Sequence, residues 1–265
     1  MVDPKVQAEL RARYNPDGSP LRRHQLKMLD ILKYVDKVCR ENDIPYWLSS
    51  GTCLGAIRHG GFVPWDDDVD IEMFGKDYDR FIRIMEHLPD CPYALQTHKT
   101  DPAFLYQFAK IRDIHSELKE NTLAADRDFK YRGIFIDVFC LDPSPGRRVA
   151  VLGEYLLRLC LAANKIDRPV VRKACRSVCY FFAFRLTAPL VKGMARLRKT
   201  GTLRHRFGSL FHKERIAADI LPLQKILFEG YEFPVPRNTD AYLKRMFGDY
   251  MELPQEKESH IADFG

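Results

Sequence analysis

Three consecutive carboxylates, Asp66 to Asp68, follow a tryptophan in the stretch GFVPWDDDVDIEMF, and a fourth, Asp70, comes two residues later. From Asp68 to Met73 polar and apolar residues alternate strictly, which predicts a half-buried strand. Residues two apart on a strand point the same way and lie about 6.6 Å apart, so Asp68 and Asp70 face a common point. Water or a divalent cation keeps such a pair ionised, and carboxylate oxygens suit Mg²⁺ or Mn²⁺.

A solvated acidic turn is the commoner explanation of a D-x-D pattern taken alone. Asp137 favours the metal site, because it stands by itself among the five apolar residues of IFIDVF, in a predicted strand covered on both faces. A bare buried carboxylate is costly, so Asp137 needs a basic side chain or a metal as its partner. Asp68, Asp70 and Asp137 would form a cation site for phosphoryl chemistry.

Within this catalytic cluster we expect Asp68 and Asp70 to hold the metal, and Asp137 to be either a further ligand or the general base. Asp66 lies in the turn before the strand and is a candidate for a further ligand. Asp67 points the other way on the alternation, and we interpret it as a solvated turn residue.

A candidate phosphate site precedes the acids. In SSGTCLGAIRHGG, the small residues Ser50, Gly51 and Thr52 follow a predicted strand and can begin a helix whose N-terminus attracts an anion, although serine and glycine are also ordinary loop residues. We expect Arg58 to contact phosphate and His59 to line the pocket. Trp65 could stack on a base, but core packing is the simpler expectation.

Two basic residues are further candidates for substrate binding. Lys110 and Arg112 share one face of a predicted strand and could bind donor phosphates, Arg through a planar fork and Lys as a point charge. A solvated strand face explains them nearly as well.

The composition fits one elaborated domain inside the cell. The chain has 265 residues, of which 46% are hydrophobic, enough to bury a substantial core. Its first residues do not match a secretory signal. Seven cysteines without framework spacing indicate free thiols in a reducing compartment.

The charge is divided unevenly. Residues 147–215 hold 17 Lys and Arg against 3 Asp and Glu, a net charge of +14, which leaves −8 on the rest of a chain whose total is +6. We expect two to four helices there, because strand alternation is missing. The most apolar part, VCYFFAFRLTAPLV, is shorter than the about 20 residues that cross a bilayer.

Such basic and apolar helices suit an anionic phospholipid surface or a negatively charged glycan carrier. Nucleic acid is not an expected partner, because none of its recognition motifs accompanies the positive charge. We expect a cytoplasmic protein that contacts the inner face of the cytoplasmic membrane peripherally.

The remaining elements follow from local patterns. Apolar residues at helical spacing predict helices at 21–41 and 78–88, and a third helix at TDAYLKRMFG, capped by Thr239 and stopped by Gly248. Strands are expected at IPYWLSS, YALQTH, FLYQFAKIRD and GIFIDVF, and a hairpin at ILFEGYEFPVP.

Taken together, SSGTCLGAIRHGGFVPWDDDVDI resembles the signature of the LicD family, which includes the fukutin-type proteins. GIFIDVFCLD resembles its second block, and LQKILFEGYEFPVP with YLKRMFGDYMELP its C-terminal end, so the likeness covers roughly 21–142 and 221–254. It implies a nucleotidyltransferase-like fold of the α/β (α+β) class, with a mixed sheet flanked by helices. Gly51, Thr52, Asp68, Asp70 and Asp137 meet the motif positions of that fold.

The resemblance also implies the reaction, which is transfer of a phospho-alcohol such as phosphocholine from a nucleotide-diphosphate donor to a sugar of a surface or lipid-linked glycan. On this basis residues 1–146 form the catalytic core, 147–215 a basic helical insertion, and 216–265 a segment that completes the core. The inserted segment matches nothing in the family pattern, and Ile114, His115 and Ser116 depart from it after AKIRD.

The same fold allows two alternative functions. The same fold could transfer a nucleoside monophosphate to a small molecule or protein and release pyrophosphate. It could also serve as a binding protein without catalysis, although an idle site has no physical reason to keep three mutually repelling aspartates.

Overall fold

The computed structural model describes residues 1–118, 128–198 and 200–254. Its helices are α1 (Pro4–Tyr14), α2 (Pro20–Glu41), α3 (Ser50–His59), α4 (Gly75–His87), α5 (Arg147–Ala162), η2 (Ala163–Lys165), α6 (Pro169–Tyr180), η3 (Phe181–Leu186), α7 (Thr187–Arg198), α8 (Ala217–Ile220) and α9 (Thr239–Phe247). Its strands are β1 (Trp47–Leu48), β2 (Asp70–Phe74), β3 (Tyr93–Gln96), β4 (Ala109–Asp113), β5 (Phe135–Pro143), β6 (Thr202–His205), β7 (Arg215–Ile216), β8 (Gln224–Phe228) and β9 (Tyr231–Val235).

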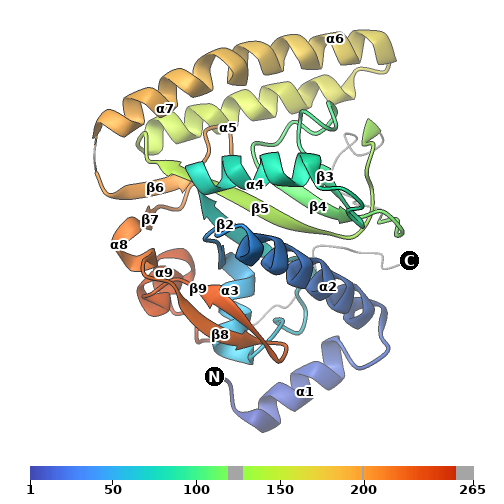
Figure 1. Ribbon diagram of the computed structural model, residues 1–265, viewed down its shortest axis with the longest axis vertical. Helices are drawn as coiled ribbons and strands as arrows, with labels where there is room; N and C mark the ends of the chain where they lie inside the picture. The colour runs from blue at the N-terminus through green and yellow to red at the C-terminus, as the bar shows by residue number, and fades with distance from the viewer. Residues whose placement is uncertain (119–127, 199, 255–265) are drawn as a thin grey trace.

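One mixed sheet organises the chain. Its order is β1-β2-β5-β4-β3, with β6 on the far end of β5 and β7 beside β6. β2 and β5 run parallel, and the other pairs are antiparallel. Figure 1 shows the sheet between a pair of long helices on one side and α2 with the β8–β9 hairpin on the other. The expected fold class, a mixed sheet flanked by helices, is confirmed.

The apolar face of the sheet builds the main core. Ile71 and Met73 on β2 are fully buried there, in one cluster with Leu32 and Val35 of α2. Alternation along the strands turns Asp70, Glu72 and Asp137 to the opposite face. The alternation predicts a strand from Asp68, but β2 begins at Asp70. Pairing with β5 nevertheless starts one residue earlier, because the Asp137 N–H donates to the carbonyl of Val69 at 2.8 Å.

Most of the predicted elements are present. Helix 21–41 is α2, the hairpin is β8–β9, and the last helix, α9, ends at Gly248 with φ +72°. Its N-cap is Asn238, not Thr239: the Asn238 side chain accepts from the N–H of Ala241. The strand expected over 104–113 is present only as β4. All seven cysteines are free thiols.

The basic segment is only partly helical. α5 and the continuous helix α6-η3-α7 account for the predicted helices, but β6 and β7 add two short strands that the sequence analysis did not predict. β6 is four residues long and pairs with the end of β5, and β7 has only two residues. Strands this short carry too little alternation to be recognised, and hydrogen bonds to the edge of a longer strand fix them.

Candidate active site

The carboxylates predicted to act together do lie together. Asp70 and Asp137 are direct register partners across the parallel pair β2–β5. Asp68 and Asp66 lie in the turn that enters β2, and their carboxyl groups share a hydrogen bond. All four side chains are partly exposed to solvent. The result is a group of four aspartates at the end of two neighbouring strands.

The charges of this group oppose one another. Burial, followed by the neighbouring Asp68 and Asp67, raises the pKa of Asp66 well above its ordinary value. The pKa of Asp70 is likewise raised by burial and then by Asp68, Asp137 and Asp66. A positive charge placed among these oxygens would relieve the repulsion.

The start of α3 closes one side of the carboxylate group. A Cβ atom on Gly51 would lie 2.8 Å from Oδ2 of Asp66, so only glycine allows the helix to approach this closely. The Thr52 hydroxyl accepts a hydrogen bond of 2.8 Å from the backbone N–H of Asp70. Ser50 has φ +47°, an uncommon conformation for a residue with a side chain. Gly51 and Thr52 therefore lie against the aspartates, and Ser50 precedes them at the start of α3.

Lys110 is the basic partner of Asp137. The two residues are register partners across β4–β5, and Nζ of Lys110 lies 3.2 Å from Oδ1 of Asp137. The ammonium also lies 3.0 Å from the ring centroid of Phe135. Of the two partners that the sequence left open, the structure places the basic side chain beside Asp137.

Arg112 lies two residues further along the same face of β4 and is fully buried. Its Nε donates to Oε1 of Gln96 at 2.5 Å and its NH1 to the carbonyl of Gly133 at 2.8 Å. These contacts fix the guanidinium within the protein.

Arg58 and His59 lie at the opposite end of α3 from Ser50, and both are buried. Arg58 donates through NH1 to the carbonyl of Tyr250 at 2.7 Å, and through Nε to Nε2 of His59 at 2.9 Å. Burial, and then the neighbouring Arg58, lowers the pKa of His59 to about 3. The two side chains thus hold the C-terminal segment against α3. None of these hydrogen bonds goes to an aspartate, but the charge of Arg58 does interact with that of Asp66.

Two neighbouring residues test further expectations. Trp65 packs edge-on against Tyr14, with ring centroids 5.5 Å apart, as core packing predicts. Asp67 is only 1% exposed, so its interpretation as a solvated turn residue is wrong. The turn is covered by α2, where Nε2 of His24 lies 3.0 Å from the Asp67 carbonyl oxygen.

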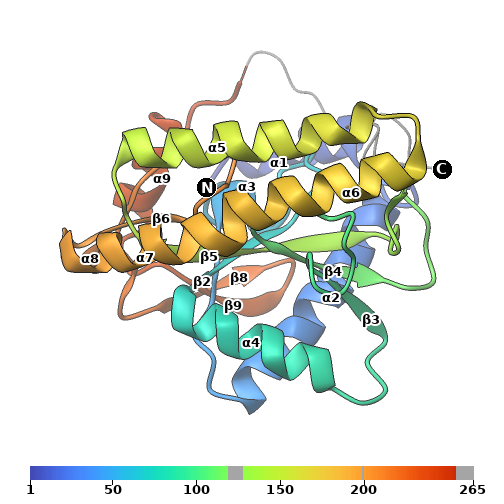
Figure 2. The same cartoon turned by 90° about the horizontal axis from the view of Figure 1, so that it is seen from above.

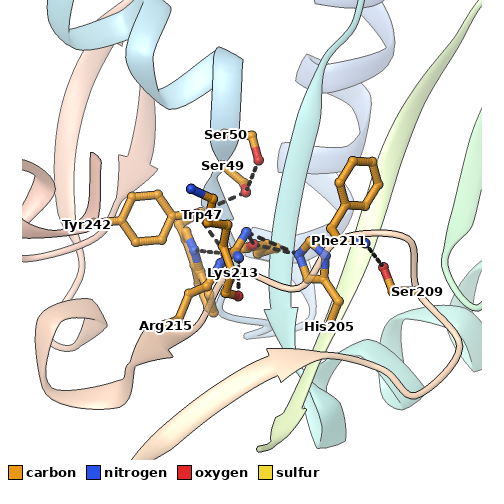
Figure 3. Close-up of polar contacts among 10 residues, drawn as sticks. Trp47, Ser49, Ser50, His205, Ser209, Phe211, Lys213, Arg215 and Tyr242 are labelled. Carbon is orange, nitrogen blue, oxygen red and sulfur yellow. Dashed lines mark hydrogen bonds and ion pairs between the residues drawn. The ribbon is translucent and has the colours of Figure 1, made fainter. Parts of the chain in front are cut away.

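A second polar cluster, which no pattern in the sequence indicated, surrounds Glu72, and Figure 3 shows Trp47, His205, Arg215 and Tyr242 from this cluster. Glu72 is fully buried, and its Oε1 accepts from NH2 of Arg215 at 2.5 Å and contacts Nε2 of His205 at 2.8 Å. Its Oε2 accepts from the Tyr242 hydroxyl at 2.8 Å and from Nε1 of Trp47 at 3.1 Å.

The Glu72 cluster keeps its carboxylate charged. Burial opposes ionisation, but Arg215, His205 and Tyr242 together outweigh it and lower the pKa of Glu72. The cluster joins β2, two residues from Asp70, to β6, β7 and α9. Alternation placed Glu72 on the acidic face, but its partners come from distant parts of the chain, so the sequence held no local signal for them.

The four aspartates fit a hard divalent cation by their chemistry, because they offer only carboxylate oxygens and repel one another. Within the described ranges, however, no three His, Cys, Asp or Glu side chains are already arranged around one point as metal ligands are. Asp66 instead bonds to Asp68, and Asp137 pairs with Lys110. Cation binding by this group requires these side chains to turn toward a shared point.

Comparison with known proteins gives two kinds of match. Residues 43–140 match the family described as LicD/FKTN/FKRP, nucleotidyltransferase domain. The chain is 27% identical over 262 residues to the lipopolysaccharide cholinephosphotransferase LicD of Haemophilus influenzae, a match that covers 92% of this chain and 97% of the relative.

The other named relatives match over a short segment. The mouse ribitol-5-phosphate transferase FKTN is 43% identical over 49 residues, which is 18% of this chain and 11% of the relative. The mouse ribitol 5-phosphate transferase FKRP is 44% identical over 48 residues, or 18% of this chain and 10% of the relative. All of these relatives are named as transferases of a phosphorylated alcohol.

Proposed function

We propose that this chain, which belongs to the LicD/FKTN/FKRP family through its nucleotidyltransferase domain, moves a phosphocholine-like group from a nucleotide-diphosphate donor to a glycan. Membership makes it a transferase of phosphorus-containing groups. In the proposal, residues 1–146 with 216–265 form the catalytic core, and residues 147–215 are an insertion. The acceptor is a sugar hydroxyl of a cell-surface or lipid-linked saccharide.

The observation that supports this activity best is the pairing of Asp70 with Asp137 across two parallel strands, with Asp66 and Asp68 beside them. Aspartates on adjacent strands give the oxygen ligands that phosphoryl transfer needs. Proteins with nucleotidyltransferase domains typically depend on a metal.

In this mechanism Asp66, Asp68 and Asp70 would hold Mg²⁺ or Mn²⁺. When bound, the ion would supply positive charge against the donor diphosphate. Ser50, Gly51 and Thr52 bind donor phosphate at the first turn of α3, where unpaired N–H groups favour an anion.

Asp137 either completes the ligand set or accepts the proton of the attacking sugar hydroxyl. Lys110 holds Asp137 in place from the adjacent strand. Because its positively charged ammonium lies beside the carboxylate group, it would also attract a phosphate of the donor bound there. Orientation of donor and acceptor for in-line attack is the main task of the protein, because little covalent chemistry falls to it.

Arg58, His59 and Arg112 support the site in this proposal. Their hydrogen bonds go to Tyr250, Gln7, Gln96 and Gly133, so they stabilise the walls from which the aspartates and Lys110 extend.

The choice of a phosphocholine-like group rests on the Haemophilus influenzae relative, because that likeness extends over 92% of this chain. The relatives that transfer ribitol phosphate match only 18% of it. We place the enzyme in the cytoplasm, at the inner face of the cytoplasmic membrane, where a lipid-linked acceptor is within reach.

The experiment is a screen of nucleotide-diphosphate donors for metal-dependent turnover, with CDP-choline and CDP-ribitol as the first pair. The proposal predicts release of CMP, and appearance of the phospho-alcohol on a saccharide acceptor. Labelled nucleotide on the acceptor with release of pyrophosphate would instead identify a nucleotidyltransferase. Absence of turnover with every donor, by a folded protein in Mg²⁺ or Mn²⁺, would support a binding protein without catalysis.

A further inference from the structure

α5 and the helix α6-η3-α7 form the outermost layer of the molecule, which we call the helical layer (residues 147–198). It runs along the top in Figure 1, and its two helices lie side by side in Figure 2. Its inner side is packed, because Leu157, Cys160 and Phe184 form a core cluster with Leu105 and Phe207 of the body. The layer is therefore fixed to the rest of the protein on one side only.

The outer side of the helical layer carries large apolar side chains in contact with solvent. On the long helix, exposed residues four apart form a row, Val178, Phe182, Leu186, Leu190 and Met194, and Val170 lies eight residues before it. Phe182 is 59% exposed and Leu190 68%. In an α-helix, residues four apart are displaced gradually around the helix axis. The wider π-helical turn of η3 partly reverses this displacement, so the row stays closer to one face. α5 adds Val151, Leu152, Tyr155 and Leu159.

Positive charge surrounds these apolar side chains. Residues 147–198 contain 12 Lys and Arg and only 2 Asp and Glu, a net charge of +10. Exposed basic residues are present along the whole layer: Arg147, Arg148, Lys165, Arg168, Lys173, Arg185, Arg196 and Arg198. Apolar rows flanked by Lys and Arg are typical of helices that lie in the interface of an anionic membrane.

The long helix lies along the body. Its 30 residues, Pro169–Arg198, have the length and composition to cross a bilayer, which the 14-residue apolar run of the sequence did not indicate. However, Arg172 and Arg176 pair with Asp128, and Lys192 pairs with Asp142 at 2.9 Å. Contacts near both ends thus hold the helix lengthwise against the domain, and this position suits a helix parallel to a membrane surface.

We propose that the helical layer docks the protein flat on an anionic phospholipid membrane. The apolar row enters the boundary between headgroups and acyl chains, while the flanking Lys and Arg contact lipid phosphates. A second copy of the chain fits this face less well, because two layers that each carry a net charge of +10 repel. This inference is independent of the transferase reaction.

The test is flotation of the full chain with vesicles of phosphatidylcholine alone and with vesicles of equal parts phosphatidylcholine and phosphatidylglycerol. Two double variants remove one feature each, namely Phe182→Ser with Leu190→Ser, and Lys173→Glu with Arg185→Glu. A matched control, Leu227→Ser with Lys244→Glu, changes equally exposed residues outside the layer. All of these side chains are exposed, so each variant should fold, and circular dichroism verifies this.

We expect flotation with the anionic vesicles only, weakened by salt. Each layer variant should lose affinity at least about tenfold, and the control should keep it. An alkaline carbonate wash should release the chain, because it does not span the bilayer.

Three results would overturn the proposal: no binding to anionic vesicles, equal binding to both kinds of vesicle, or layer variants that float like the parent chain. Retention after the carbonate wash would contradict flat docking. A dimer in the absence of lipid that Phe182→Ser with Leu190→Ser dissociates would assign the apolar row to a second copy.

Discussion

Asp70 and Asp137 are direct partners across the parallel strands β2 and β5, and Lys110 pairs with Asp137 from the other side. Two acids and one base therefore occupy adjacent positions on three neighbouring strands. The arrangement keeps one acid balanced by a fixed cation, while the others repel. A divalent cation would balance the negative charge that Lys110 leaves on the other aspartates.

Lys110 should contribute strongly to stability. The Lys110→Met variant leaves Asp137, whose side chain is only 14% exposed, without its cation, which should cost about 3 kcal/mol of unfolding free energy. Adding Asp137→Asn should recover part of that loss. Urea denaturation of the single and double variants measures the coupling. Lys37→Met, which breaks an exposed pair with Glu41, is the control and should cost less than about 1 kcal/mol. Equal losses for Lys110→Met and Lys37→Met would contradict this role.

Loss of the Glu72 charge should lower the unfolding free energy at least as much as loss of the Lys110–Asp137 pair. Glu72→Gln leaves Arg215 buried without a counter-charge and should cost about 3 kcal/mol or more. Tyr242→Phe removes one hydrogen bond to Glu72 and should cost about 1.5 kcal/mol. Tyr155→Phe, at an exposed tyrosine, provides the baseline in the same denaturation series. A Glu72→Gln variant as stable as the parent would show that the ion pair is dispensable.

The mutual repulsion of the aspartates predicts that removing one of their charges stabilises the fold. Burial and the neighbouring aspartates raise the pKa of Asp70, so folding disfavours its ionised form. In EDTA, Asp70→Asn should therefore raise the unfolding free energy by about 1 kcal/mol. Mg²⁺ should raise the melting temperature of the parent chain more than that of the variant. Asp30→Asn, at an exposed helix position, should change neither value. A destabilised Asp70→Asn protein in EDTA would contradict the repulsion.

His59 predicts a loss of stability in acid. Its pKa is lowered to about 3, so between that value and its ordinary 6.5 the unfolded chain binds a proton that the folded chain does not. Stability from this residue is complete above about pH 6.5 and falls as the pH approaches 3, by up to about 5 kcal/mol. His59→Asn should flatten the curve of unfolding free energy against pH over this window. An unchanged slope would show that other groups set it.

The sequence predicted features that depend on neighbouring residues, but not contacts between residues far apart in the chain. The alternation after Asp68 and the apolar run around Asp137 are local, so the two strands and their acids were predictable. Pairing is not local: nothing near Lys110 or Asp137 indicates that their strands are neighbours. The partners of Glu72 lie far along the chain: His205 is 133 residues away, Arg215 143 and Tyr242 170. No sequence pattern connects them to Glu72.

The long helix shows a different limit. Arg185 and Pro189 interrupt the apolar run, so the sequence indicated a segment too short to cross a bilayer. The structure continues the helix through both residues, from Pro169 to Arg198, with a π-helical turn ending just before Pro189. The side on which its apolar residues point depends on packing against Phe207 and Leu105, which lie in other segments.

The most direct test of the central claim is the rate at which the purified chain releases CMP from the donor found in the screen, with and without Mg²⁺, for the parent and Asp70→Asn. We expect turnover that EDTA abolishes and Mg²⁺ restores. We also expect a rate at least about a thousandfold slower for Asp70→Asn, with an unfolding curve showing an intact fold. An Asp70→Asn protein with the parent rate, or full activity in EDTA, would contradict a metal-dependent role for Asp70.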